Sequence, residues 1–212
     1  MRKALTTAAL VIATASVVSG SYARNNDDEP MTFSWTAQEI CLVGHPGTFT
    51  PGGDMTDFFA QIPAWGAGMI TFHPAASTAR DKGNWMFFLP LSFLTQPPGT
   101  PQNAFPARTS VGECTLTYQP GDGLSFTLKA PRIGCSATDT SGPNQGVKTT
   151  FTNGPETRGQ FAADMQSFVA HHNELGSQDK FVIETGSDSN GGQFERICMR
   201  AIQGVRLPSN KR

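Results

Sequence analysis

The stretch CTLTYQPGDGLSFTLKA, residues 114–130, decides the fold of this chain. In both halves of the stretch, apolar residues alternate with Thr, Ser, Gln or Lys at every second position. A period of two places alternate side chains on opposite faces of a strand, so each half is predicted to form a strand with one buried face. The PGDG between them, residues 120–123, is typical of a tight turn. The stretch therefore predicts a β-hairpin and, with it, a mainly β protein.

Short apolar runs cut by Gly and Pro continue in both directions from this hairpin. They predict further strands at Thr32–Thr36, Ile40–Val43, Gly68–His73, Trp85–Leu94, Val147–Thr152, Phe181–Thr185 and Phe194–Ile202. About eight or nine short antiparallel strands, with a turn roughly every ten residues, pack as a barrel or a sandwich. No internal repeat or linker divides the chain, so residues 31–207 are expected to form a single β-rich domain.

One segment, residues 158–175, departs from the strand pattern. Phe161, Met165, Phe168 and His172 follow the three-and-four spacing of one helix face. A Thr-x-x-Gln sequence that fits a capping box stands at its start, and a glycine follows its last apolar residue. The sequence predicts one amphipathic α-helix here, packed on the β core.

The first 23 residues have the three-part pattern of a secretory signal peptide. Arg2 and Lys3 form a basic start, residues 4–20 carry no charge, and Ser21 and Ala23 place small residues before a cleavage point. The uncharged run is short for a bilayer span and contains several Thr and Ser, which disfavours an uncleaved anchor. We therefore expect export to the periplasm or the medium, and no transmembrane span after cleavage. Residues 24–30 are expected to form a flexible leader and residues 208–212 a flexible tail.

The charge of the chain excludes one class of partner. Loss of Arg2 and Lys3 with the signal leaves 14 of the 16 basic residues against 17 acidic ones. Binding to a phosphate backbone depends on many Lys and Arg contacts, so nucleic acid is not expected as a partner. The sequence contains no phosphate loop and no dinucleotide fingerprint, and no cofactor is expected.

Four cysteines, Cys41, Cys114, Cys135 and Cys198, follow the signal. An even count in an exported chain predicts two disulfides, with three possible pairings. No two cysteines have the short separation of a zinc site, and no metal is expected. We prefer Cys41–Cys198, which joins the first strand to the last, and Cys114–Cys135, which spans one excursion of the chain.

The adjacent histidines His171 and His172 raise the question of chemistry. Neighbours on a helix point about 100° apart, so the pair does not grip one metal ion. On the predicted helix, His172 lies among Phe161, Met165 and Phe168. It is either a neutral histidine at the edge of the core or the one polar group in the wall of an apolar ligand cavity. The second interpretation makes these four residues the candidate ligand-binding set.

Carboxylates are the other candidate chemistry, because glycosidase-type enzymes use them in pairs. The acids Glu39, Asp54, Asp57, Asp81, Glu113, Glu184 and Glu195 are scattered along the chain, and only Glu113, Glu184 and Glu195 lie in or next to predicted strands. An ion pair with a neighbouring arginine is the ordinary interpretation of Glu195. Together with His172, the last three acids are the candidate acid–base groups of an enzyme.

The order of these features resembles small exported bacterial β-barrels of the calycin type, which include lipocalin-like and allene-oxide-cyclase-like domains. The resemblance rests on Cys41 before GTF at residues 47–49, GMITF at 68–72, the Cys-led strand at 114–118 and ICMRA at 197–201. GNW at residues 83–85 matches the lipocalin Gly-x-Trp, but in lipocalins this motif lies on the first strand. The lipocalin role is therefore not carried over to Trp85 or Arg200. The resemblance implies a barrel whose interior takes an apolar ligand.

Two classes of function follow from these expectations. The favoured class is a non-catalytic exported module that binds a small apolar ligand in its interior, or a protein partner. The alternative is a hydrolase- or isomerase-type enzyme of the cell envelope or the medium that uses the acid–base groups named above. An apolar interior without convergent polar groups favours the first class, and opposed carboxylates or a strongly perturbed His172 in a pocket favour the second.

Overall fold

The computed structural model describes residues 29–49, 58–88, 107–130, 135–151, 156–172, 183–187 and 192–208. These residues form the strands β1 (Met31–Gly44), β2 (Phe58–His73), β3 (Thr78–Phe87), β4 (Arg108–Pro120), β5 (Ser125–Lys129), β6 (Cys135–Asp139), β7 (Lys148–Phe151), β8 (Glu156–Phe161), β9 (Ser167–His172), β10 (Glu184–Ser187) and β11 (Gln193–Arg206). The expected signal peptide, most of the expected leader and nearly all of the expected tail lie outside the described residues. The helical element described is a 3-10 turn at Pro74–Ala76. Within the described ranges, no helix has the length and apolar character needed to cross a bilayer.

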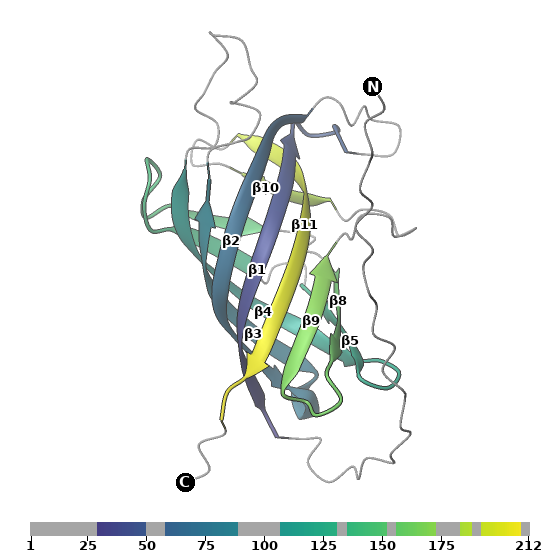
Figure 1. The fold of residues 1–212 in the computed structure, drawn as a ribbon. Helices are drawn as coiled ribbons and strands as arrows, with labels where there is room; N and C mark the ends of the chain where they lie inside the picture. The colour runs from purple at the N-terminus through teal and green to yellow at the C-terminus, as the bar shows by residue number, and fades with distance from the viewer. Residues whose placement is uncertain are drawn as a thin grey trace, which may run out of the picture.

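Eight of the strands close into a ring. They pair in the order β3–β2–β1–β11–β9–β8–β5–β4, and β4 pairs back onto β3. Every pairing is antiparallel, as the register of each neighbouring pair shows. The long strands β1, β2 and β11 lie side by side across the front, with β3 and β4 behind them (Figure 1). The mainly β, antiparallel fold expected from the sequence is confirmed.

The ring divides in two over part of its height. One edge of β4 pairs with β6 along residues 110–114 and with β5 along residues 117–120. In the same way, one edge of β11 pairs with β10 along residues 193–196 and with β9 along residues 200–205. One branch therefore runs from β11 through β9, β8 and β5 to β4. The other branch runs from β11 through β10, β7 and β6 to β4, and in it β10 and β7 lie in contact. The interior of the ring is left unfilled at the level where the two branches separate.

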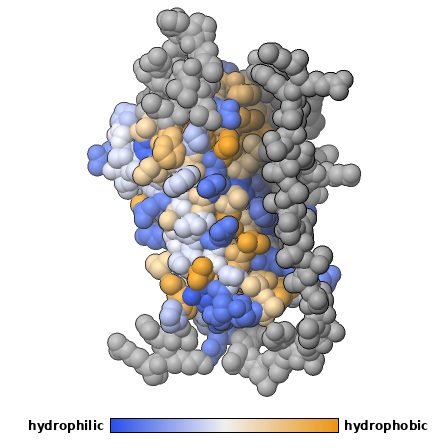
Figure 2. Space-filling view, in the orientation of Figure 1, coloured by the Kyte–Doolittle hydropathy of each residue, from blue (hydrophilic) through white to orange (hydrophobic). Residues whose placement is uncertain are grey.

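The core follows from strict alternation along the strands. In β1 the odd positions from Phe33 to Val43 are buried, and most of the even positions are not. Five phenylalanines, Phe33, Phe72, Phe126, Phe161 and Phe168, fill one end of the ring with ring centroids 4.6 to 6.2 Å apart. A second cluster, which includes Val43, Ile62 and the Cys41–Cys198 pair, fills the other end. On the outer face, polar and apolar side chains are interspersed (Figure 2).

Glycines lie directly across from the large aromatic residues of the interior. A ring folded over the neighbouring strand needs a residue without Cβ beneath it, and this pairing also compensates the low strand propensity of glycine. The opposed pairs are Trp35↔Gly68, Trp85↔Gly66, Phe126↔Gly159, Phe168↔Gly204 and Phe194↔Gly186. This rule explains why glycine occurs inside strands in a fold with so much aromatic core.

The close approach of the strands at these glycines can be tested by substitution of Gly68. A Cβ at this position would lie 2.3 Å from the Lys82 carbonyl oxygen and 2.5 Å from the Gly83 Cα. These are backbone atoms, which cannot move away as a side chain does. We expect Gly68→Ala to lower the free energy of unfolding by about 1–3 kcal/mol, the usual cost of overpacking, measured by urea titration. Ala67→Ser, on the outward side of the same strand, should change it by less than about 0.5 kcal/mol. Equal stabilities of the two variants would contradict the close approach.

The β-hairpin predicted at residues 114–130 is confirmed, while other expectations from the sequence need correction. Strands β4 and β5 pair through Tyr118↔Leu128 and Gln119↔Thr127, around the turn at residues 120–123. The expected strands Thr32–Thr36 and Ile40–Val43 form one strand, β1. The expected strand Trp85–Leu94 begins inside β3, and its residues 89–94 lie outside the described ranges. The expected strand Phe181–Thr185 is described only from residue 183 and enters β10.

The α-helix expected at residues 158–175 is wrong over the part that is described. Residues 156–161 and 167–172 are the paired strands β8 and β9, and a short turn joins them. Phe168, Ala170 and His172 are buried while Val169 and His171 are exposed, which is a period of two. The turn between the two strands has a length that continues the three-and-four spacing of apolar residues. For this reason the sequence positions of Phe161, Met165, Phe168 and His172 matched one face of a helix. Met165 lies in that turn with a φ of 56°.

Two disulfides join facing strands. Cys41 of β1 bonds to Cys198 of β11, and Cys114 of β4 bonds to Cys135 of β6. In each case the two residues are direct cross-strand partners, with Cα atoms 4.0 and 4.3 Å apart. This is the pairing preferred from the sequence, and it links the first strand to the last.

Candidate functional site

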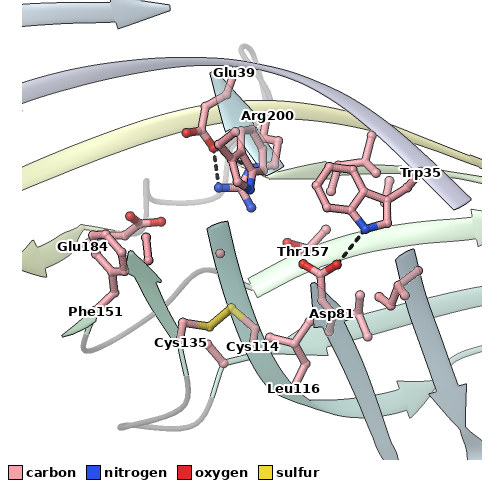
Figure 3. A pocket seen from close by; sticks show the side chains of 18 of the residues that line it. Trp35, Glu39, Asp81, Cys114, Leu116, Cys135, Phe151, Thr157, Glu184 and Arg200 are labelled. Atoms are coloured by element: carbon pink, nitrogen blue, oxygen red, sulfur yellow. Dashed lines mark hydrogen bonds and ion pairs between the residues drawn. A yellow bond between two sulfur atoms is a disulfide. The ribbon is translucent and has the colours of Figure 1, made fainter. Parts of the chain in front are cut away.

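A cavity of about 110 Å³ lies inside the ring where its two branches separate. Most of its wall is apolar, with Leu116, Leu128, Phe168 and the Cys114–Cys135 disulfide among the lining residues. Ionisable side chains from four strands also reach it: Glu39, Asp81, Glu184 and Arg200, which Figure 3 labels, and Arg196. The interior is therefore apolar with a compact set of convergent charged groups.

The strand register brings these charged groups together. Glu39 is directly opposite Arg200 on the β1–β11 pair, and Glu184 is opposite Arg196 on the β10–β11 pair. All four belong to the inward-facing series of their strands, since Glu39 is two residues from Cys41 and Arg200 is two residues from Cys198. The two arginines are four residues apart on β11, one at the end of each branch of the ring.

Each arginine is held by a carboxylate and by an aromatic ring. Arg200 donates hydrogen bonds to Glu39 through Nε and Nη2, and its guanidinium carbon lies 4.6 Å from the centre of the Trp85 ring. Arg196 donates through Nε to Glu184 and lies 4.2 Å from the centre of the Phe151 ring. Stacking of this kind favours a desolvated guanidinium, so both cations are fixed in place.

The charges of this network reinforce one another. Burial opposes ionisation of Glu184, but Arg196 and Arg200 favour it more strongly and hold the pKa of Glu184 below its usual range. Burial likewise disfavours the charged form of Arg200, but Glu39 and Glu184 outweigh it and raise the pKa of Arg200. Glu184 and Arg200 are therefore both charged at neutral pH.

Asp81 is the exception among the acids of the cavity. The Trp35 indole donates a hydrogen bond from Nε1 to Asp81 Oδ1 over 2.7 Å. Burial raises the pKa of Asp81 to about 6, and the Trp35 hydrogen bond and the charge of Arg200 only partly oppose this. Within the described ranges, Asp81 forms no ion pair, whereas Glu39 and Glu184 each have an arginine. At neutral pH it is a half-buried carboxylate without a cation of its own.

Ser110 supplies an unpartnered polar atom in the cavity wall. Its side chain is 1% exposed, and its Oγ has no hydrogen-bond partner among the described residues. A buried hydroxyl without a partner costs roughly 1–3 kcal/mol, so such atoms are rare in native proteins. The cavity wall therefore offers a hydrogen-bonding group that a bound molecule can use.

His172, the residue singled out in the sequence, is buried beside this network. It follows Phe168 and Ala170 on the inward side of β9, is directly opposite Arg200, and its Nδ1–H donates to the Glu156 carbonyl oxygen over 3.1 Å. Burial, with help from the positive charge of Arg200, lowers the pKa of His172 to about 4, although Glu184 and the backbone oxygen oppose this. His172 is therefore neutral at neutral pH.

The other members of the predicted ligand-binding set are spread over the core. Phe168 lines the cavity, whereas Phe161 belongs to the phenylalanine cluster and Met165 packs against that cluster from the β8–β9 turn. Their role in ligand binding stays a prediction.

The predicted acid–base groups do not form an opposed pair. Glu113 is exposed on the outside of β4, where a hydrogen bond from Lys82, 2.6 Å away, lowers the pKa of its carboxyl. Glu195 accepts a hydrogen bond from the Phe49 backbone N–H over 3.4 Å. Glu184 alone of the three faces the cavity. The ion pair suggested for Glu195 is formed instead by the inward Glu184.

Three oxygen and sulfur atoms near Glu39 have the spacing of metal ligands. The carboxylate of Glu39 and the sulfurs of Cys41 and Cys198 lie within 4.8 Å of one another. The two sulfurs are bonded to each other, so neither is available as a thiolate. This group therefore offers only one ordinary ligand.

A second hollow, of about 810 Å³, lies on the outer face around Trp65, which is 61% exposed. It crosses β11, β1, β2, β3 and β4, and its described lining residues carry no charge. A third hollow, of about 390 Å³, has Glu39, His171, His172 and Arg200 in its wall, so Glu39 and Arg200 line both this hollow and the cavity.

Several residues of the cavity were missed in the sequence: Trp35, Glu39, Asp81, Ser110, Arg196 and Arg200. A usable signal was present, because in residues 33–43 every second residue reads Phe, Trp, Ala, Glu, Cys, Val. A glutamate in the buried phase of an apolar strand indicates an internal charge. Asp81 has the same phase between Ala79 and Gly83 in β3.

The shifted pKa values of Asp81 and His172 predict opposite effects of pH on the stability of the fold. The raised pKa of Asp81 gives stability that is present below its ordinary value of 3.8 and is lost as the pH rises through about 6. The lowered pKa of His172 gives stability that is present above 6.5 and is lost as the pH falls through about 4. In the wild type these contributions nearly offset each other between these limits.

Asp81→Asn separates the two contributions. We expect it to raise the free energy of unfolding by about 2–3 kcal/mol at pH 7.5, because it removes the unpaired charge and keeps an acceptor for Trp35. The gain should disappear near pH 4, where the wild-type carboxyl is protonated. Urea titrations at both pH values check this, with the exposed turn residue changed in Asp122→Asn as the control. An equal effect of Asp81→Asn at both pH values would contradict a half-buried, unpaired carboxylate.

Comparison of the chain with protein-family models, with curated proteins and with solved structures finds no match. The function proposed for the chain thus rests on the chemistry of these interior residues.

Proposed function

We propose that this protein is an exported binding module that holds a small, mostly apolar molecule in the cavity of the strand ring. The observation that carries the proposal is the cavity itself, which is apolar on most of its wall and has a few fixed polar groups. Ligand sites have this composition, because apolar area supplies affinity and placed polar atoms supply orientation.

Pre-organisation of the paired charges supports binding, whereas Asp81, the cavity acid without an arginine partner, is the group that the enzyme alternative would use as its base. Glu39 and Glu184 are each bound by an arginine, and His172 donates to a backbone oxygen. A general base needs a free lone pair within reach of the substrate, while paired carboxylates act as fixed charges. His172 does not line this cavity, but with Glu39 and Arg200 it lines a separate, open hollow of about 390 Å³, and its low pKa there is the observation that favours the enzyme alternative.

Export and the calycin-like barrel remain parts of the same proposal. Two disulfides between strands suit an oxidising compartment, as the expected signal peptide requires. A closed ring of antiparallel strands around an internal cavity supports the barrel with an apolar ligand that the calycin resemblance implies.

Occupancy of the cavity tests the proposal. We expect native mass spectrometry of protein purified without denaturant to show a small non-covalent adduct, or ligand-observed NMR to show binding of five- to seven-atom organic probes. Ala137 lines the cavity, so Ala137→Leu should remove either signal, while Ala67→Leu on the outer face should keep it. Absence of both signals in the wild type, or binding that survives Ala137→Leu, would overturn the proposal.

A further inference from the structure

We propose that the molecule bound in the cavity is a small organic cation, a primary ammonium on a short apolar chain, and that Asp81 is its counterion. This inference rests on the proposed function and assigns the ligand's chemical class. Three observations carry it: the charge balance of the cavity, the surroundings of Asp81, and the unpartnered Ser110.

The charges that line the cavity do not balance. Glu39, Asp81 and Glu184 face it with three carboxylates, whereas Arg196 and Arg200 supply two cations. Each arginine is already bound by one glutamate, so Asp81 is the acid in excess. His172, opposite Arg200, adds no charge at neutral pH, and Arg108 is paired with Asp139 at 3.1 Å. One positive charge on a ligand would make this described set neutral, which an apolar interior strongly favours.

The surroundings of Asp81 suit an ammonium group. Trp35 holds one carboxylate oxygen through its indole N–H, which fixes the carboxylate in orientation. Trp35 and Trp85 both line the cavity, with ring centroids 5.6 Å apart, and aromatic faces attract cations. Arg200 already lies over the Trp85 ring, so the ammonium is assigned to the Trp35 side of the cavity, next to the Asp81 carboxylate. An alkyl chain would then extend along Leu116, Leu128 and the Cys114–Cys135 disulfide.

Ser110 indicates the far end of the ligand. On β4, Cys114 is the direct partner of Asp81, and Ser110 lies four residues further along, which is roughly 13 Å of strand. A single ammonium therefore does not contact both side chains. The unpartnered hydroxyl of Ser110 would instead bond to a polar group at the other end of the chain. The geometry points to an amine with a terminal hydroxyl or a similar neutral group.

Three small-molecule probes that share a carbon chain but differ in charge test the assignment. The probes are 5-aminopentan-1-ol, pentane-1,5-diol and 5-hydroxypentanoate, which share the chain and one hydroxyl and differ in charge at the other end. Each is titrated at pH 7.5 into the full exported chain, with backbone amide NMR shifts as the readout. We expect the amine to bind at least about tenfold more tightly than the diol, and the anion to bind most weakly.

Two variants locate the effect. Asp81→Asn should bring the amine-to-diol ratio close to one, while Asp122→Asn in the exposed β4–β5 turn should leave it unchanged. Ser110→Ala should weaken 5-aminopentan-1-ol but not pentylamine, which lacks the hydroxyl. An Asp81→Asn protein with a native-like amide spectrum excludes unfolding as the cause.

The outcomes separate this inference from the proposed function. Equal binding of amine and diol, tightest binding of the anion, or a ratio that survives Asp81→Asn overturns the cation and leaves the binding module in place. Binding of none of the three probes, together with no adduct in the native protein, overturns both.

Discussion

Arg200→Met is expected to lower the free energy of unfolding by about 3–5 kcal/mol, because it leaves buried carboxylates without their shared cation. Arg200 is hydrogen-bonded to Glu39, acts electrostatically on Asp81 and Glu184, and covers the Trp85 ring. Methionine keeps an apolar stem of similar length but carries no charge. Glu39 would then lose the arginine that binds it, while Glu184 would keep Arg196. The loss should be smaller at acidic pH than at pH 7.5, because acid removes uncompensated carboxylate charge. Urea titration monitored by tryptophan fluorescence measures both values.

Two control variants distinguish loss of charge from loss of packing. Arg158→Met removes an exposed arginine, bound to Glu156 at 3.3 Å, and should change the free energy of unfolding by less than about 0.5 kcal/mol. Glu39→Leu combined with Arg200→Met replaces the whole pair by apolar groups and should recover part of the stability. A double variant as unstable as Arg200→Met alone would show that packing, not the uncompensated charge, causes the loss.

Removal of the Cys41–Cys198 disulfide is expected to have a still larger effect. The bond closes a loop of 157 residues, against 21 for Cys114–Cys135. On the chain-entropy account, Cys41→Ala with Cys198→Ala costs about 5 kcal/mol, and Cys114→Ala with Cys135→Ala about 3 kcal/mol. For a domain of this size the first pair should lower the thermal midpoint by roughly 10–20 °C.

Calorimetry without reductant compares the two double variants. Both disulfides join direct cross-strand partners, but Cys41–Cys198 is buried in the core and Cys114–Cys135 is half-buried, so loop length and burial both favour a larger loss for the first pair. A larger loss for Cys114–Cys135 would contradict the entropic order. Thiol titration of the denatured wild type should find no free thiol, and any free thiol at Cys198 would contradict the pairing itself.

Much of the fold was readable because it is local. The alternation in residues 114–130 predicted the β4–β5 hairpin, whose turn residues and buried phase agree. Disulfide pairing also followed, since cysteines in the first and last strands of a closed ring become neighbours. Residues 158–172 misled the analysis of periodicity: two short strands joined by a turn imitated the apolar spacing of a helix. Six-residue segments are too short for periodicity to separate the two structures.

The sequence by itself determined the mainly antiparallel β character and the four cysteines that join its strands. It also determined the buried face of the hairpin strands β4 and β5, because a period of two is a property of the chain alone. Only the tertiary structure decided that the strands of Glu39, Asp81, Glu184, Arg196 and Arg200 meet around one cavity. Register and ring closure pair residues that are far apart in the chain, such as Glu39 and Arg200, which are 161 positions apart. Such distant contacts depend on the packing of the whole core, so no local pattern specifies them.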